Sequence, residues 1–370
     1  MLTIFTSIYS GKEVLTGHLV KNYFPTKHSK GGILYQTKQK ITLDFTKNHS
    51  IAELLGDRDK LIKIIEKEYN VDIFVLGNDI EIVGKNKNVQ NVVKLLNELT
   101  LQINIGQKID SQRVGDSIKI MEDKSTLKPH EIFDDFITVN SGKKIKARTE
   151  GQKKYMEAIR NNTIVFSIGP AGTGKTYLAL AMAVGSLILN EISRIILVKP
   201  VVEAGEKLGF LPGDMYDKIN PYLRPLYDAL YEMLDIETFQ RYMDMGIIEV
   251  VPLAYMRGRT LNDSFIILDE AQNASPEQMK MFLTRLGFGS RVVITGDITQ
   301  IDLPQEKKSG LIQVRNILDK ISGIEFIYLT SKDVVRHSLV QKIVDAYKIY
   351  EEILVSENLK TVTEKNGSKE

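Results

Sequence analysis

Gly169-Pro-Ala-Gly-Thr-Gly-Lys-Thr176 follows the apolar run Thr163-Ile-Val-Phe-Ser-Ile168 and opens the helix-favouring segment 176–189. This is the phosphate-loop pattern G-x-x-x-x-G-K-T between a strand and a helix, the context that the motif requires. Small residues let backbone N–H groups close around phosphate oxygens. Lys175 is placed to reach the β- and γ-phosphates, and the Thr176 hydroxyl to bind Mg²⁺. The predicted nucleotide-binding residues of this stretch are Gly169, Pro170, Ala171, Gly172, Thr173, Gly174, Lys175, Thr176 and Tyr177.

A second motif, a pair of acids, follows the short apolar run 264–268, which is typical of a buried parallel strand. The next residues are Asp269 and Glu270. An acid at the carboxyl end of such a strand lies where ligands bind in open α/β sheets. Asp269 is therefore predicted to hold Mg²⁺, and Glu270 to orient and deprotonate a water molecule.

Two glutamines are candidate partners of the nucleotide. Gln300 follows the predicted strand 291–295, and its amide can donate to a γ-phosphate or accept from an attacking water. Gln152 lies upstream of the phosphate loop, and an amide can pair with adenine at two points. The alternatives are a polar loop residue for Gln300 and an exposed helix residue for Gln152.

Composition places few limits on function. The 370 residues are 43% apolar and 26% charged with a net charge of +2, as in a soluble globular protein of two or three domains. There is no Cys, which excludes disulfides and thiolate chemistry and suits a cytoplasmic location. We expect no signal peptide and no membrane span.

The chain is predicted to contain five segments. Residues 1–38 form an extension, 39–105 a small α/β module, and 106–145 a polar linker with apolar patches that dock on a neighbour. Residues 146–352 alternate strands and helices, which indicates a parallel sheet. Residues 353–370 form a polar, disordered tail.

The small module has its own element pattern. Residues 40–45 alternate as a strand, and residues 48–50 can cap a single helix over 51–69. Strands over 71–76 and 79–83 are joined by the hairpin signal Gly77-Asn78. A second amphipathic helix spans 89–99. The predicted order is β-α-β-β-α.

The residues around the phosphate loop favour ATP hydrolysis. No N-K-x-D tetrapeptide, the guanine signature of GTPases, follows Thr176. Small-molecule kinases usually lack a glutamate directly after the strand-end aspartate, whereas Glu270 follows Asp269. Water is therefore the expected acceptor of the phosphoryl group.

Taken together, the motifs resemble those of the PhoH family. They comprise GPAGTGKT at 169–176, VKPVVEAGEKLGFLPGD at 198–214, AYMRGRTL at 254–261, FIILDEAQNASPEQMKMFLTR at 265–285, TGDITQIDLP at 295–304 and DVVRHSLVQKIVDAY at 333–347. The resemblance is dense over about 146–350. It implies a RecA-like sheet similar to the first motor domain of superfamily 1 helicases, ATP hydrolysis, and a role with RNA, in RNA metabolism or near the ribosome.

Residues 39–105 resemble the KH-like N-terminal module of PhoH proteins. A KH domain clamps a nucleic-acid backbone with a G-x-x-G loop. Here the comparable stretch is Gly56-Asp57-Arg58-Asp59, which lacks the second glycine and carries two acids. A structural or protein-docking module is the alternative to an RNA clamp.

A further cation is expected at the γ-phosphate. The 66 residues after Pro304 are too few for the second motor domain that supplies it in helicases. Arg336 is the remaining candidate. If it cannot reach its own subunit's nucleotide, it would act on a neighbouring subunit's nucleotide in a head-to-tail homo-oligomeric ring. The alternative is a local pair with Asp333.

Arg257 and Arg259 flank Gly258 before the Asp269 strand, a cationic turn suited to phosphate from nucleotide or RNA. A solvated turn is the alternative. The sequence thus predicts an ATP- and Mg²⁺-using hydrolase. A nucleotide-dependent switch, or a scaffold whose nucleotide site is only structural, stays open, and turnover separates them.

Overall fold

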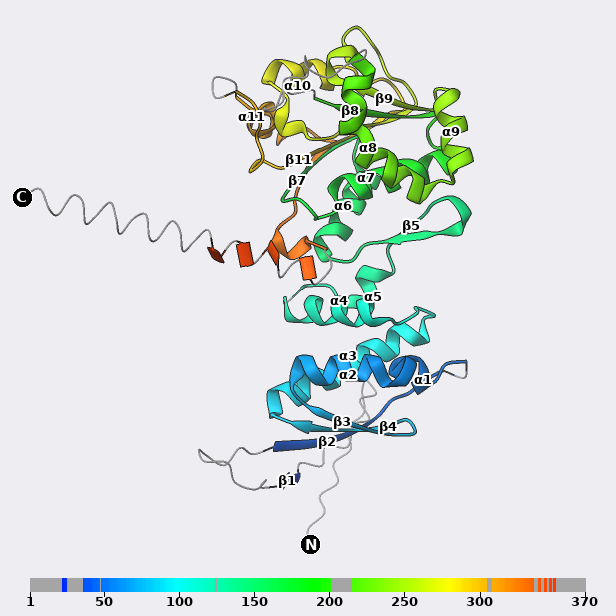
Figure 1. The fold of residues 1–370 in the computed structure, drawn as a ribbon, viewed down its shortest axis with the longest axis vertical. Coiled ribbons are helices and arrows are strands. Elements are labelled where there is room, and N and C mark those ends of the chain that lie inside the picture. Colours follow the sequence, from blue (N-terminus) through cyan, green and yellow to red (C-terminus); the bar gives the residue numbers. More distant parts are fainter. Residues whose placement is uncertain are drawn as a thin grey trace, which may run out of the picture. The chain divides into compact units, whose positions relative to one another are not determined.

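Residues 22–24, 36–46, 48–123, 125–200, 215–304 and 308–335 are described by the computed structural model, with the pairs 339–340, 343–344, 346–347 and 349–350. The chain divides into two compact units, Met1–Glu131 and Ile132–Glu370. Figure 1 labels the elements of both units. Each unit buries apolar side chains of its own.

The first unit is a small α/β layer. Its antiparallel sheet has the order β1-β2-β4-β3, formed by β1 (Asn22–Phe24), β2 (Gln36–Thr42), β3 (Asp72–Leu76) and β4 (Asp79–Gly84). Alternate residues of β4 are buried, because one sheet face is covered by helices. These include α1 (Ile51–Leu55), α2 (Lys60–Tyr69) and α3 (Asn86–Asn104). From β2 to α3 the order is β-α-α-β-β-α, so the predicted β-α-β-β-α module is present with its first helix divided in two.

The prediction of a single helix over 51–69 is wrong. Helix α1 ends at Gly56, whose φ is 69°, and a short 3₁₀ turn over Asp57–Asp59 separates it from α2. A Cβ at Gly56 would lie 2.7 Å from Leu61 Cγ, so a glycine lets the turn close onto the core. Arg58 and Asp59 both have positive φ values, which are uncommon for residues with a side chain.

Regular structure also fills the segment 106–145. Helix α4 (Ser111–Glu122) contributes Val114 and Ile118 to the core of the first unit. Then follow α5 (Pro129–Phe133), β5 (Phe136–Thr138), the 3₁₀ turn Asn140–Gly142 and β6 (Lys144–Lys146). Strands β5 and β6 form a hairpin in the second unit. The predicted apolar patches therefore belong to ordered elements, while the predicted domain boundaries stay a prediction.

The second unit contains a six-stranded parallel sheet in the order β12-β7-β11-β10-β8-β9. Its strands are β7 (Ile164–Ile168), β8 (Arg194–Lys199), β9 (Ile248–Pro252), β10 (Ser264–Leu268), β11 (Arg291–Gly296) and β12 (Ile324–Tyr328). Every residue of β7 and β10 is buried, which explains their continuous apolar sequences. The topology confirms the predicted RecA-like parallel sheet, with β11 between the phosphate-loop strand and the Asp269 strand.

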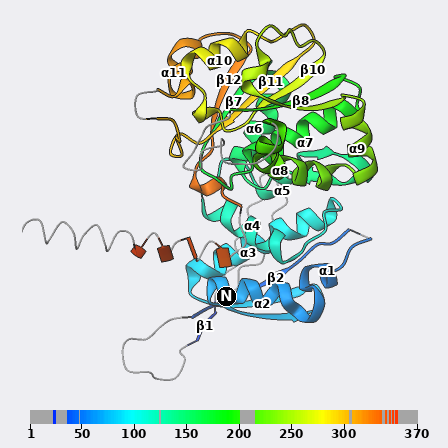
Figure 2. The ribbon, with the colours of Figure 1, turned by 45° about the horizontal axis from the view of Figure 1, so that its top comes forward.

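Helices cover both faces of this sheet (Figure 2). On one side lie α6 (Glu150–Asn161), α7 (Lys175–Ile188), α8 (Met215–Met233) and α9 (Ile236–Asp244). On the other lie α10 (Pro276–Leu283) and α11 (Gly310–Leu318), whose Phe282 and Leu311 pack in one core with Phe166 of β7. In the part of the chain that is described, no helix has the length and apolar character to cross a bilayer.

Candidate functional site

The turn between β7 and α7 is the predicted phosphate loop. Gly172 and Gly174 both have a φ of 84°, a left-handed conformation that glycine adopts without steric cost. Gly174 is the N-terminal cap of α7, so Lys175 and Thr176 begin the helix. Backbone N–H groups at a helix start are free of intrahelical partners and attract anions. The loop therefore has the local geometry of an anion site.

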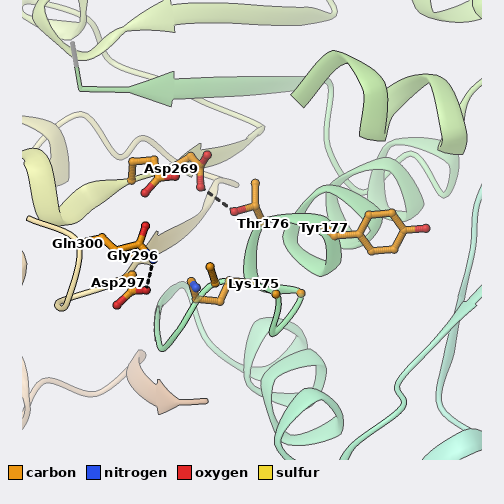
Figure 3. Close-up of a pocket in the computed structure, with 11 residues that line it drawn as sticks. Lys175, Thr176, Tyr177, Asp269, Gly296, Asp297 and Gln300 are labelled. Carbon is orange, nitrogen blue, oxygen red and sulfur yellow. Dashed lines mark hydrogen bonds between the residues drawn. The ribbon is translucent and has the colours of Figure 1, made fainter. Parts of the chain in front are cut away.

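The loop borders a cavity of about 290 Å³ at the carboxyl ends of three neighbouring strands (Figure 3). The residues that line the cavity lie at or after the ends of β7, β10 and β11. They are Ala171, Gly172, Gly174, Lys175, Thr176, Tyr177, Asp269, Glu270, Gly296, Asp297 and Gln300. The structure thus brings together the predicted loop, the two predicted acids and Gln300. Gly169, Pro170 and Thr173 belong to the loop but not to the cavity lining.

Thr176 and Asp269 meet at one wall of the cavity. The Thr176 hydroxyl donates to Asp269 Oδ1 over 2.6 Å (Figure 3), and the Thr295 hydroxyl donates to the same oxygen over 2.7 Å. Asp269 is only 8% exposed, so these hydrogen bonds fix its carboxylate. Hydroxyl and carboxylate oxygens are the ligands that Mg²⁺ prefers, and Mg²⁺ usually takes one or two of them together with phosphate and water. The residues fit the predicted metal.

Lys175 places a positive charge in the cavity. Its ammonium group donates to the carbonyls of Gly169 at 2.7 Å and Pro170 at 3.0 Å. Burial lowers the pKa of Lys175, while the carboxylates of Asp297, Glu270 and Asp269 act in the opposite direction. No ion pair within 4.0 Å joins Lys175 to these acids in the described chain, so its charge is available to a ligand.

Glu270 and Gln300 are joined by a residue that the sequence analysis missed. The Gln272 amide donates to Glu270 Oε2 at 2.7 Å and to the Gln300 carbonyl at 3.2 Å, and its Oε1 accepts from the Asp297 N–H at 3.0 Å. Gln272 is 1% exposed, so these three bonds are shielded from water. Glu270 itself has a positive φ of 54°. Gln272 therefore fixes the acid relative to the loop after β11.

Asp297 is a second cavity residue that the sequence analysis missed. Its carboxylate accepts from the Gln300 side-chain amide at 2.9 Å (Figure 3) and from the Thr299 hydroxyl at 2.6 Å. These bonds orient the Gln300 side chain beside the cavity. The available signal was position, because Asp297 follows Gly296 at the carboxyl end of a buried strand, as Asp269 follows Leu268.

Gln152 and Tyr177 approach the loop from outside. The Gln152 amide donates to the Thr173 carbonyl at 3.1 Å and its oxygen accepts from the Arg148 N–H at 2.9 Å. Gln152 is 4% exposed and is absent from the cavity lining. Tyr177 lines the cavity, but Figure 3 shows its ring directed away from Lys175. Its hydroxyl lies 3.2 Å from Glu232, and burial raises the pKa of Tyr177 to about 12.

The remaining predicted cations lie elsewhere. Arg259 makes a two-point ion pair with Glu249 of β9, at 2.8 and 2.6 Å, which raises its pKa. Arg257 is exposed, and neither arginine lines the cavity. Arg336 lies outside the described residues. The structure therefore separates the Arg257 and Arg259 pair from the cavity.

Sequence comparison agrees with this geometry. A family model described as PhoH-like protein matches residues 144–348. The chain belongs to the PhoH-like protein family. It is 52% identical to a PhoH-like protein of Mycobacterium bovis over 302 residues, which cover 82% of this chain and 86% of the relative. It is 51% identical to a PhoH-like protein of Bacillus subtilis, covering 80% and 92% of the two chains.

Among solved structures, the Pif1 helicase from Candida albicans matches 53% of this PhoH-like chain and 42% of its own, at 14% identity and a TM-score of 0.28. A similarity this low supports no argument about function. The family assignment confirms the predicted PhoH resemblance. The chain is a PhoH-like protein, and its phosphate loop and parallel sheet form a site of the kind that binds nucleotides.

Proposed function

We propose that the protein is a Mg²⁺-dependent ATPase that works with RNA. The observation that carries the proposal is the meeting of three kinds of group around one cavity: the Lys175 cation, the Thr176 and Asp269 oxygens, and the Glu270 carboxylate with Gln300. A phosphoryl-transfer site needs a cation for the phosphates, ligands for Mg²⁺, and a group that positions the attacking water. The segments after β7, β10 and β11 supply these groups together.

The roles follow from chemistry and position. The N–H groups of the loop and Lys175 bind the phosphates. Mg²⁺, held by Thr176 and Asp269, would neutralise charge on the β- and γ-phosphates. Glu270 takes the proton of the attacking water, and Gln300 holds that water or the γ-phosphate by its amide. Gln272 and Asp297 keep Glu270 and Gln300 in place.

ATP rather than GTP is proposed because the guanine signature N-K-x-D is missing after Thr176. Hydrolysis rather than transfer to a small molecule is proposed because Glu270 directly follows Asp269. The test is phosphate release from Mg²⁺-ATP by wild type and by Lys175→Ala, with and without single-stranded RNA. We expect wild-type turnover that RNA stimulates, and about a hundredfold or greater loss of ATP affinity in the variant, since a phosphate-paired charge is removed. Tight binding with negligible turnover would favour a nucleotide switch instead.

The RNA part of the proposal is supported by a basic surface in the first unit. Arg58, Lys60, Lys63 and Lys67 line a surface hollow of about 460 Å³ together with Asp57 and Ile64. The three lysines follow one another at helical spacing on α2, and all four cations are exposed. Cations in a row bind phosphates without reading sequence. The proposed RNA contact is therefore electrostatic and does not need the second glycine of a G-x-x-G loop.

A matched pair of double variants tests the basic surface. Lys63→Gln/Lys67→Gln removes two unpaired charges, and we expect RNA affinity to fall roughly tenfold at low salt with a shallower salt dependence. Lys38→Gln/Lys40→Gln is the control, because these lysines already pair with Glu81 and Asp79 at 2.7 Å each. Equal losses in both double variants would remove the surface from the proposal.

We also propose a head-to-tail ring in which Arg336 completes a neighbouring subunit's site. The support is the sequence alone, since Arg336 lies outside the described residues. Lys175→Ala and Arg336→Ala subunits should each be inactive, and a mixture should regain part of the activity at interfaces that combine an intact loop with an intact arginine. Mass measurement of mixed assemblies checks that subunits exchange. A monomeric protein with full activity, or exchanged mixtures without activity, would exclude an arginine in trans.

A further inference from the structure

The carbonyl oxygens of the phosphate loop are held from outside the cavity. The Gly172 carbonyl accepts from the Val335 N–H at 3.0 Å, and the Thr173 carbonyl accepts from the Gln152 amide at 3.1 Å. In a trans peptide, the carbonyl of one residue and the N–H of the next point in opposite directions. Holding these two carbonyls therefore orients the N–H groups of Thr173 and Gly174 away from the donors. The loop's phosphate-binding face depends on this outer pair of donors.

The two outer donors come from distant parts of the chain, and one hydrogen bond joins them. Thr149 is the N-terminal cap of α6, and its hydroxyl oxygen accepts from the Gln152 N–H at 3.1 Å. The same hydroxyl donates to Asp333 Oδ1 at 2.6 Å. Asp333 lies two residues before Val335 and is 6% exposed. Thr149 and Asp333 thus fix the start of α6 and the segment after β12 to each other.

The other oxygen of Asp333 is also engaged. Its Oδ2 accepts from the Thr330 N–H at 2.8 Å, in a capping box around the turn Ser331–Asp333. The carboxylate therefore joins its own turn to the first turn of α6, where a negative charge is favoured by the helix dipole. A substitution that displaces Asp333 should move the Val335 N–H away from Gly172.

A glycine permits this close approach. A Cβ at Gly151 would lie 2.3 Å from Asp333 Oδ1 and 2.7 Å from its Cγ. Gly151 is inside α6, where alanine is intrinsically the better helix former. A glycine at this position weakens the helix, yet it makes room for the Asp333 carboxylate.

We propose that Asp333 and Thr149 are positioning residues of the phosphate loop, which act through Val335 and Gln152 to orient its N–H groups for the triphosphate whatever base it carries. The inference rests on the proposed function, since it assumes that the loop binds nucleoside triphosphates. It gives Gln152 a role in shaping the phosphate site, where the sequence analysis predicted a contact with adenine.

The decisive variant is Gly151→Ala, with Gly115→Ala as its control. Both add a methyl group inside a helix, but a Cβ at Gly115 of α4 meets nothing within 4 Å. Calorimetric titration would use Mg²⁺ complexes of ATP, GTP and inorganic tripolyphosphate. We expect Gly151→Ala to weaken all three by a similar factor of about ten, as when a buried hydrogen-bonded group loses its partner. Gly115→Ala should bind like wild type.

A second pair of variants, at Thr149, distinguishes a loss of loop positioning from a loss of folding. Thr149→Val keeps the shape but removes the hydroxyl, whereas Thr149→Ser keeps both of its hydrogen bonds. We expect the valine variant to weaken the three ligands equally and the serine variant to restore binding, with thermal unfolding measured for each. Wild type that binds none of the three ligands would end the proposed function itself. Wild-type affinity in Gly151→Ala and Thr149→Val, or a loss confined to ATP, would overturn the inference alone.

Discussion

At the centre of the parallel sheet, Asp269 and Glu270 face hydroxyl and amide groups, whereas on the edge strand β9 the Glu249 carboxylate is neutralised by Arg259. Both regions carry charged residues close to strand ends. In the edge region the opposite charges meet at 2.6 Å and leave little for a ligand. At the centre the acids are held by neutral donors, the hydroxyls of Thr176 and Thr295 and the amide of Gln272. The acids of the candidate site are thus held in place by hydrogen bonds with neutral groups, whereas Glu249 is held by a cation.

The topology explains the difference. Strand β11 lies between β7 and β10, so the segments that follow three strands converge on one cavity and supply hydroxyls and amides to each other's acids. Within the described residues, strand β9 pairs with β8 alone, and the partner of Glu249 lies ten residues further along the chain. Substitutions at the centre should therefore lower ATP turnover, whereas substitutions at the edge should lower the free energy of unfolding.

The largest effect is expected from Glu270→Gln. It keeps the size and hydrogen-bonding capacity of the side chain and removes the base, so turnover should fall by about 10²–10⁴. ATP affinity and thermal unfolding should stay near wild type. The control is Glu277→Gln. Glu277 lies on α10, accepts a hydrogen bond from the Ser275 hydroxyl and is not part of the cavity lining. Surviving turnover in Glu270→Gln would transfer the role of base to another group.

Gln272→Leu should have an intermediate effect and should lower both the turnover and the free energy of unfolding. It removes three buried hydrogen bonds and leaves the Asp297 N–H without its acceptor. We expect a loss of about 1–3 kcal/mol in the free energy of unfolding and a fall in kcat of roughly tenfold or more as Glu270 loses its fixed position. Denaturant unfolding and steady-state kinetics measure the two. Unchanged kcat would mean that Gln272 is only structural.

The smallest effects are expected at the edge. Arg259→Ala should lower the free energy of unfolding by about 1 kcal/mol, since a two-point but partly exposed ion pair is removed. Arg257→Ala should stay within about 0.5 kcal/mol of wild type. Neither should change ATP turnover in the absence of RNA. Loss of RNA stimulation in Arg257→Ala would restore the predicted contact with nucleic-acid phosphate.

The phosphate loop was predictable because its signal is local: glycines, Lys175 and Thr176 occupy one short stretch between a strand and a helix. Asp269 was predictable because a buried strand ends directly before it. Gln272 was not predicted, since its role depends on β11 lying beside β10, which no local pattern specifies. Asp297 was missed although it follows a buried strand, as Asp269 does. The ion pair of Arg259 and the break at Gly56 depend likewise on contacts with Glu249 and Leu61.

Glu270 has a left-handed backbone, at a φ of 54° and ψ of 39°. For a residue with a side chain this conformation is disfavoured by about 1–2 kcal/mol, and glycine avoids most of that penalty. Glu270→Gly would consequently relax the turn while deleting the proposed base. A selection for heat resistance alone would favour that substitution, and a survey of stabilised variants would report an improved protein that no longer works. Resistance to heat and catalysis thus compete at this one backbone position.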